Sequence, residues 1–170
     1  MYAYHFRGYW KDVGTISSLW EANMEVLDPE NSGINLFDDS WKIYSRNSGM
    51  TGHRISADAI VENSMITDGC RVSGNVKHSI LFAGVQVEPG AEVEDAVVMG
   101  GTVIKSGAVV KHCIVAENVV IGENAVVGAM PTDGEKGVAT VGPGVYIGDN
   151  AKVGPNAMVS NNVKDGEVQW

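Results

Sequence analysis

The chain has 170 residues, of which 44% are hydrophobic and 21 are glycine, so it suits one domain with a real core, or one domain and a fragment of another. A formal net charge of −9 argues against nucleic acid or an anionic membrane as the main partner, because neither would meet a basic surface. The two cysteines, Cys70 and Cys113, lack the spacing of a disulfide framework or a zinc ribbon. Without a run of about 20 apolar residues or a signal-peptide pattern, the sequence predicts a cytoplasmic protein with reduced thiols.

The first 15 residues have the character of a domain end. Residues 2–6 alternate like a strand, yet they would expose aromatic side chains and have no partner strand nearby in the sequence. Residues 8–15, with the sequence GYWKDVGT, turn into the next segment. We therefore expect residues 1–15 to be the end of a larger domain that lies upstream, with Met1 at a boundary.

A linker is expected over residues 16–52. Apolar residues at helical spacing predict a helix over about 16–27, and Ser18 followed by Glu21 has the form of a capping box. The sequence DPENSG at 28–33 ends this helix. Residues 36–44 are aromatic and extended. We expect the helix and this aromatic segment to cover the first end of the domain that follows.

A six-residue repeat organises the rest of the chain. β-Branched aliphatic residues recur in steps of six at Val97, Val103, Val109, Val115, Ile121 and Val127, and again at Val141, Ile147, Val153 and Val159. This period fits neither a helix nor a flat amphipathic strand. It fits a chain that turns a corner every six residues and points one aliphatic side chain inward per side. We therefore predict an all-β fold, a parallel β-helix of about six coils over residues 53–170.

Two segments interrupt or close the repeat. Fourteen residues separate Val127 from Val141, so a loop over about 129–140 is expected to leave the coil. Such a loop either carries contacts to another domain or subunit, or is a tolerated insertion. Residues 163–170 are expected to cover the last coil, whose strand edge would otherwise lack a partner.

Three motifs together resemble one enzyme family. They are GYWKDVGT at 8–15, LWEANM at 19–24, and LFD at 36–38 with WKIYS at 41–45. The combination resembles the glucose-1-phosphate adenylyltransferases (ADP-glucose pyrophosphorylases) of the bacterial glycogen pathway. The similar segment is the one where the catalytic domain of those enzymes ends and a left-handed β-helix begins. The resemblance runs through the whole chain and implies a left-handed coil.

The resemblance implies an activity for a longer protein. Such an enzyme converts ATP and glucose 1-phosphate to ADP-glucose and pyrophosphate. Asp12 matches the acidic residue that helps hold the catalytic Mg²⁺, which offsets the repulsion between the two polyanionic substrates. Nothing here matches the family's glycine-rich ATP loop. We therefore expect no complete catalytic set, no assigned substrate-binding residue, no bound cofactor and no activity in these 170 residues alone.

The resemblance also implies assembly and regulation. The family's enzymes are homotetramers controlled by anionic metabolites, and their β-helix contacts the catalytic domain and other subunits. The sequence GVATV at 137–141 is similar to a segment near the family's regulatory region. Lys136 is the nearby cation, and we name it as the candidate regulatory residue.

Other functions stay open at this point. Hexapeptide β-helices also form trimeric acyltransferases with a catalytic histidine, and metal enzymes with three histidines. His5, His53, His78 and His112 lie far apart without metal-ligand spacing, and we expect each to be a surface residue without a catalytic role. Nucleotidyltransferases that make GDP-mannose or UDP-N-acetylglucosamine share the two-domain plan. A further alternative is a structural and oligomerising module with no activity of its own.

Overall fold

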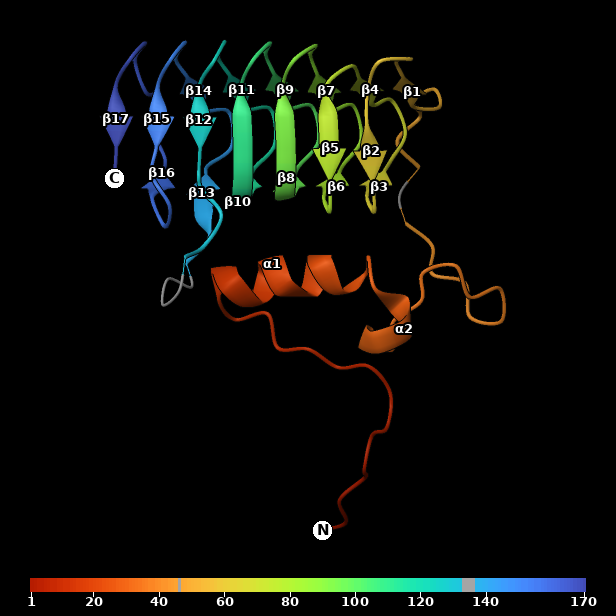
Figure 1. Cartoon of the computed structure of the whole chain (residues 1–170). Helices are drawn as coiled ribbons and strands as arrows, with labels where there is room; N and C mark the ends of the chain where they lie inside the picture. Colours follow the sequence, from red (N-terminus) through yellow and green to blue (C-terminus); the bar gives the residue numbers. More distant parts are fainter. Residues whose placement is uncertain (46, 133–136) are drawn as a thin grey trace.

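The protein is a three-sided prism of short parallel strands, seen here in a computed structural model that describes residues 1–45, 47–132 and 137–170. Strands pair with strands one coil away rather than with their sequence neighbours (Figure 1). The prediction of a left-handed parallel β-helix is confirmed. The described residues make about seven turns, against the predicted six.

Each face of the prism is one ladder of strands. The first face holds β1 (Arg54–Ile55), β4 (Arg71–Val72), β7 (Gln86–Val87), β9 (Val103–Ile104), β11 (Val120–Ile121) and β14 (Tyr146–Ile147). The second face holds β2 (Val61–Glu62), β5 (Asn75–Lys77), the first half of β8 (Glu92–Val98), the first half of β10 (Val109–Val115), β12 (Val126–Val127), β15 (Lys152–Val153) and β17 (Val168–Gln169). The third face holds β3 (Met65–Ile66), β6 (Ile80–Leu81), the second halves of β8 and β10, β13 (Ala139–Val141) and β16 (Met158–Val159). β8 and β10 therefore turn the corner between the second and third faces.

Stacked aliphatic side chains fill the prism. Each face contributes one inward ladder of buried residues: Val72, Val87, Ile104, Ile121 and Ile147 from the first face, Val76, Val93, Val110, Val127 and Val153 from the second, and Leu81, Val98, Val115 and Val141 from the third. β-Branched side chains suit this pleated and crowded environment. Coils lie about 4.8 Å apart, the spacing of neighbouring strands, so equivalent side chains touch along the whole prism.

The predicted register is wrong in its first half. Val97, Val103 and Val109 were expected to point inward, but Val98, Ile104 and Val110 occupy the core. The reason is the length of the coil, which repeats every 17 residues here, as the pairing of Val98 with Val115 shows. One side of each such coil is a residue shorter than six. From Val115 onward the predicted inward residues are buried or partly buried in the core.

The linker forms two helices, α1 (Ile16–Glu25) and α2 (Pro29–Ser32). The predicted capping box of Ser18 and Glu21 is wrong, because the capping box lies three residues earlier, at Thr15 and Ser18. Thr15 is the N-cap, its Oγ1 accepts a hydrogen bond from the amide of Ser18, and the Oγ of Ser18 accepts one from the amide of Thr15. The reciprocal geometry matches a capping box although serine replaces the usual Glu or Gln.

Helix α1 does not cover the end of the prism as predicted. It lies along the third face, with its axis running beside several coils (Figure 1). The aromatic segment over 36–44 covers little either, since Phe37 and Trp41 are 81% and 80% exposed. The chain before α1 extends away from the prism, and the strand expected over residues 2–6 is absent. Within the described chain, both segments therefore leave large aromatic side chains exposed.

The loop and the C-terminal segment both end in strands. The chain leaves the second face after β12, and Val138 is buried again, so residues 139 and 140 of the predicted loop belong to β13 (Ala139–Val141). Residues 133–136 lie outside the described part. At the end of the chain, Val163 bridges to Ile147 and β17 pairs with β15. Residues 163–170 thus complete the last coil rather than capping it from outside.

Candidate functional site

The contact between α1 and the third face, which we call the helix junction, has an apolar part and a polar part. The apolar part is a buried cluster of Met24, Val97, Ile114 and Val138, with Leu19, Trp20, Leu27 and Met99 packed against it. Val97 and Ile114 are direct neighbours on successive coils and point outward. Burial of one such side chain stabilises by about 1.5–3 kcal/mol. The outward apolar residues of the third face therefore exist to hold the helix.

The polar part lies where the second face turns into the third. His78, Asp95 and His112, which we call the polar corner, occupy one position on three successive coils. Their φ angles are 44°, 57° and 45°. Asp and His enter this left-handed region more readily than most residues with a side chain. A sharp corner without a separate turn thus favours these residue types.

Asp95 connects the two histidines. Its Oδ1 lies 2.5 Å from Nδ1 of His78, and its Oδ2 lies 3.4 Å from Nδ1 of His112. An ionised carboxylate can only accept hydrogen bonds, so the geometry favours a proton on Nδ1 of each ring. The His112 side chain is 8% exposed, whereas that of His78 is 36% exposed. The corner therefore has one buried and one accessible imidazole on a shared carboxylate.

Trp20 joins α1 to the polar corner. Its Nε1 donates a hydrogen bond to the backbone carbonyl of Asp95 at 2.8 Å. Its ring lies against His112, with centroids 4.5 Å apart and planes inclined by 58°. A buried indole N–H needs such an acceptor. One side chain of the linker thus contacts two members of the corner.

The expectation that the histidines lie far apart is wrong for His78 and His112, and the expected surface position is wrong for His112, whose side chain is 8% exposed. The coil brings both to Asp95. The signal in the sequence is the spacing, because 17 residues separate each of the three from the next, which is the coil length in this region. His5 and His53 are exposed. Across the described residues, no three His, Cys, Asp or Glu side chains gather to hold a metal.

Ion pairs and a hydrogen bond between side chains connect the segment before α1 to the helix. Lys11 Nζ lies 2.6 Å from Glu25 and 3.0 Å from Glu21, and the hydroxyl of Tyr9 donates to Glu25 at 2.6 Å. The hydrogen bonds from Lys11 and Tyr9 hold the pKa of Glu25 below its ordinary value. The same bond to Glu25 raises the pKa of Tyr9. The GYWKDVGT motif is thereby anchored on the outer side of α1.

Of the two predicted site residues, the structure describes only Asp12. Asp12 is exposed beside this anchor, and its carboxylate makes no hydrogen bond or ion pair to the described residues. It is available as one oxygen ligand, but Mg²⁺ takes about six. Lys136 lies outside the described residues.

A pocket opens beside the helix junction. It is lined by Trp20, Glu21, Met24, Glu25, Asp28, Asn31, Ser32 and His78. Three carboxylates face it, so it repels anions such as the phosphates of an acyl carrier. His78 is the accessible base in this wall, but its surroundings do not suit an acyltransferase that binds such a carrier.

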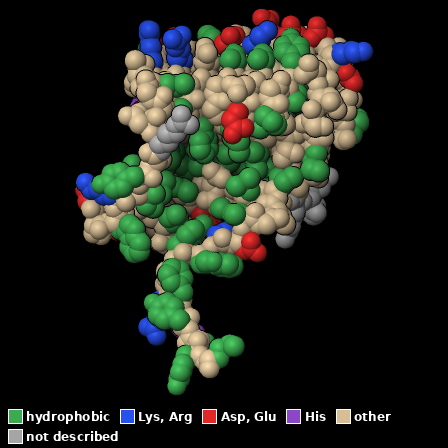
Figure 2. All heavy atoms as spheres, turned by 180° about the vertical axis from the view of Figure 1, so that it is seen from behind, with side chains coloured by type: hydrophobic (Ala, Val, Ile, Leu, Met, Phe, Trp, Pro, Cys, Tyr) green, Lys and Arg blue, Asp and Glu red, His purple; other side chains and the backbone are tan. Residues whose placement is uncertain are grey.

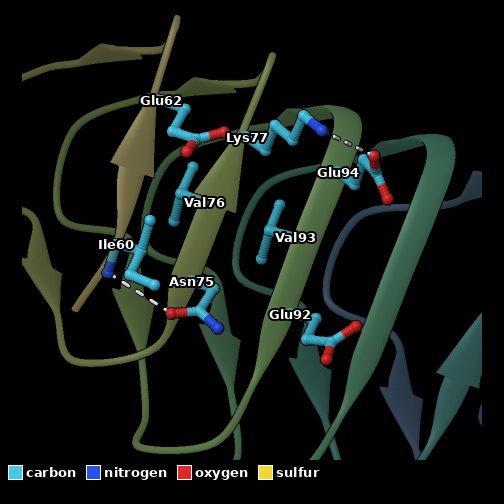
Figure 3. A pocket seen from close by; sticks show the side chains of 8 residues that line it. All are labelled: Ile60, Glu62, Asn75, Val76, Lys77, Glu92, Val93 and Glu94. Carbon is cyan, nitrogen blue, oxygen red and sulfur yellow. Dashed lines mark hydrogen bonds and ion pairs between the residues drawn. The ribbon is translucent and has the colours of Figure 1, made fainter. Parts of the chain in front are cut away.

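A smaller hollow lies on the second face across β2, β5 and β8 (Figure 3). Glu62, Lys77, Glu94 and Lys111 hold equivalent outward positions on successive coils and alternate in charge. Lys77 lies 3.8 Å from Glu94, and Lys111 lies 3.4 Å from the same carboxylate. Both lysines thus pair with Glu94 across the ladder. These pairs stabilise the stacking of coils by a modest amount and leave neither lysine free for an anionic ligand.

The fold and the helix junction define a hexapeptide-repeat β-helix whose side is joined, through a linker helix, to the segment before it. Residues 48–147 match the family model described as GlmU-like, C-terminal hexapeptide, and the chain belongs to that family. Residues 1–29 match the model described as Nucleotidyl transferase. That second match takes in both the GYWKDVGT motif and α1, so the helix junction lies where the two matched families meet.

A curated relative carries the resemblance further. The chain is 53% identical over 90 residues to a glucose-1-phosphate adenylyltransferase from Geobacillus stearothermophilus, which covers 53% of this chain and 23% of the relative. The chain thus spans about a quarter of that protein's length. Among solved structures, a mutant perosamine N-acetyltransferase from Caulobacter crescentus, in complex with CoA and GDP-perosamine, is similar at 22% identity and a TM-score of 0.34, over 70% of this chain and 53% of that one. At that score the similarity carries no argument.

Neither described helix has the length and apolar character needed to span a membrane.

Proposed function

We propose that these residues form the C-terminal part of a glucose-1-phosphate adenylyltransferase, in which the β-helix positions the catalytic domain and contributes to assembly. The whole enzyme would form ADP-glucose and pyrophosphate from ATP and glucose 1-phosphate for glycogen synthesis in the cytoplasm. The supporting comparisons are the 53% identity to such an enzyme and the nucleotidyltransferase match over residues 1–29.

The helix junction is the observation that carries this proposal. Residues matched to a nucleotidyltransferase end in a helix that is fastened to the β-helix by Trp20 and Met24. Lys11 fastens the preceding motif to the same helix. A rigid helix between two bodies transmits position from one to the other. The β-helix would thus hold the end of the catalytic domain at a fixed orientation.

Asp12 would contribute to the Mg²⁺ site of the whole enzyme. Its exposed and unpaired carboxylate supplies one hard oxygen ligand, and the other ligands would come from upstream residues and from substrate phosphates. When bound, the ion would neutralise charge as the two phosphate-bearing substrates approach. The chain's own part is to hold Asp12 in place, through the contacts of Lys11 and Tyr9 with Glu25.

Assembly and regulation complete the proposal. The whole enzyme would be a homotetramer, and an anionic metabolite would regulate it, with Lys136 as a candidate contact. Light scattering of the 170-residue chain over a concentration series tests the assembly role. A dimer or tetramer would assign assembly to the β-helix, whereas a monomer would assign it to the catalytic domain.

An activity assay tests the proposed reaction. The 170-residue chain is compared with the same chain preceded by the nucleotidyltransferase domain of the Geobacillus relative. Both receive Mg²⁺ with ATP and glucose 1-phosphate, GTP and mannose 1-phosphate, or UTP and N-acetylglucosamine 1-phosphate. We expect ADP-glucose from the joined protein alone. Activity of the joined protein with another substrate pair only, or ADP-glucose formation by the 170-residue chain, would overturn the assignment.

A further inference from the structure

The first two rungs of the first face carry the same three-residue pattern. Arg54-Ile55-Ser56 and Arg71-Val72-Ser73 lie side by side, with Arg54 paired to Arg71 in the parallel ladder. Alternation along a strand places the Arg and Ser side chains outward and the aliphatic residue inward. Val72 is fully buried in the core, as this alternation requires. Two guanidinium groups and two hydroxyl groups therefore share one small area of the surface.

The four side chains line one pocket. Arg54, Ser56, Arg71 and Ser73 form its wall together with the backbone around Gly52 and Gly69. The hydroxyl groups of Ser56 and Ser73 lie 2.7 Å apart, which fixes them as neighbours on adjacent rungs. Both arginine side chains are exposed. The pocket thus combines mobile cationic donors with two hydroxyls that the strands hold in position.

Arg54 and Arg71 have no acidic partner among the described residues, as is also true of Lys105, Lys152 and Lys164. Lys11, Lys42, Lys77 and Lys111 each lie within 4.0 Å of a carboxylate, whereas no carboxylate of the described residues is that close to Arg54 or Arg71. Like charges side by side on neighbouring strands destabilise a sheet. This pair occurs in a chain of net charge −9, so it is not a consequence of general basicity. Figure 2 shows basic side chains at the upper left, the end of the prism that holds the first coils.

The pattern stops after two rungs. The next rung places Gln86 beside Arg71 and Glu88 beside Ser73. The Glu88 carboxylate is already engaged, because it accepts hydrogen bonds from the amide and hydroxyl of Ser106 at 3.0 and 3.1 Å. The basic area is therefore two coils wide, about the size of a single phosphate group with its donors.

We propose that Arg54 and Arg71, with Ser56 and Ser73, bind a phosphate group, either as inorganic phosphate or as the phosphate monoester of a small metabolite. Guanidinium groups present paired N–H donors that match phosphate oxygens, and hydroxyl groups add further donors. A bound dianion also relieves the repulsion between the two arginines. The site is complete within the β-helix, so it does not depend on the proposed nucleotidyltransferase activity.

Titration of the ¹⁵N-labelled 170-residue chain, followed by NMR, tests the site with inorganic phosphate and with glucose 1-phosphate as probes. We expect saturable shifts of the amides of residues 54–56 and 71–73 with at least one probe. Equal affinity for both probes means that the site contacts only the phosphate group. Tighter binding of the sugar phosphate by tenfold or more means that the pocket also reads the organic part.

Matched variants keep the proposal falsifiable. Arg54→Gln and Arg71→Gln should each weaken binding about tenfold or more, and the double variant should abolish it. Lys152→Gln removes an exposed cation from the second face and should leave binding unchanged. The absence of saturable shifts at these amides, or equal affinity in the double variant and the parent chain, would overturn the proposal. Folding of each variant is checked from the unchanged amide shifts of the last coils.

Discussion

The indole nitrogen of Trp20 donates a hydrogen bond to the backbone carbonyl of Asp95, a residue 75 positions further along the chain. The contact joins the linker helix to the backbone of the β-helix at the corner where Asp95 also binds two histidines. A side chain on a helix of ten residues has therefore become part of the solenoid. Short helices are marginal by themselves, so α1 depends on this attachment.

Trp20→Phe should loosen α1 without unfolding the prism. The substitution keeps an aromatic ring but removes the N–H donor, which costs about 0.5–1.5 kcal/mol. Hydrogen exchange of the α1 amides is expected to accelerate, while the amides of the inner strands stay protected. Trp41→Phe serves as the control, because Trp41 is 80% exposed. Unchanged exchange in α1 would contradict the role given to the indole nitrogen.

Asp95→Asn should weaken the same attachment by another route. Asparagine tolerates the left-handed backbone but cannot accept hydrogen bonds on two oxygens. Loss of one acceptor in this partly buried network costs about 1–3 kcal/mol. Urea unfolding should show a lower midpoint, and faster exchange should spread from the corner into α1. Asp165→Asn, at an exposed turn, is the comparison.

Acid should detach the GYWKDVGT motif from α1 before the prism unfolds. The pKa of Glu25 is lowered from 4.5 by the hydrogen bonds from Lys11 and Tyr9. A depressed carboxyl pKa contributes stability that is present above the unfolded value and is lost as pH falls through the folded value. The Nζ signal of Lys11 and the amides of residues 9–11 should therefore change below pH 4.5. Glu25→Gln should remove this dependence; a retained transition would assign it to another group.

Both cysteines should resist alkylation in the folded chain. Burial raises the pKa of Cys113 to about 12 and also raises that of Cys70. The thiolate is the reactive form, so at pH 8 little of it is present, and neither side chain is accessible. Mass spectrometry after iodoacetamide treatment should show no adduct until denaturant is added. An adduct on Cys113 under native conditions would show that the core opens there.

Ile121→Asp should unfold the coil, whereas Val120→Asp should be tolerated. Ile121 is fully buried within the inward ladder, and its neighbour Val120 points outward from the same strand. An unpaired carboxylate among aliphatic side chains costs more than about 4 kcal/mol. Circular dichroism and thermal unfolding separate the two variants. Equal stability would mean that the register of β11 is wrong.

The sequence predicts the coil well because many aliphatic residues repeat at the same six-residue spacing, and each repeat indicates the same geometry. It predicts the register less well, since Val97 and Val98 are both valines and only the pairing with the next coil shows which one is inside. An outward Val97 is buried all the same, because α1 covers it. Single-sequence periodicity cannot separate burial in the core from burial under a helix.

The polar corner escaped prediction for a related reason. His78, Asp95 and His112 are separated by 17 residues, and this spacing has meaning only once the coil length is known. The position of α1 depends on the outward residues of the third face, which a six-residue pattern of inward residues does not address. The ion pairs of Lys11 likewise depend on how the chain turns before α1.

The linker helix rests on the middle of the solenoid, at β8, β10 and the return to β13, and the coils from β14 onward do not contribute to its buried cluster. The attachment and the length of the prism are therefore separable. A whole coil could be added or removed beyond β14 with the ladders still in phase, and the contacts of α1 with the third face would not change. The length of the solenoid beyond β14 can thus vary without any change in the residues of the helix junction.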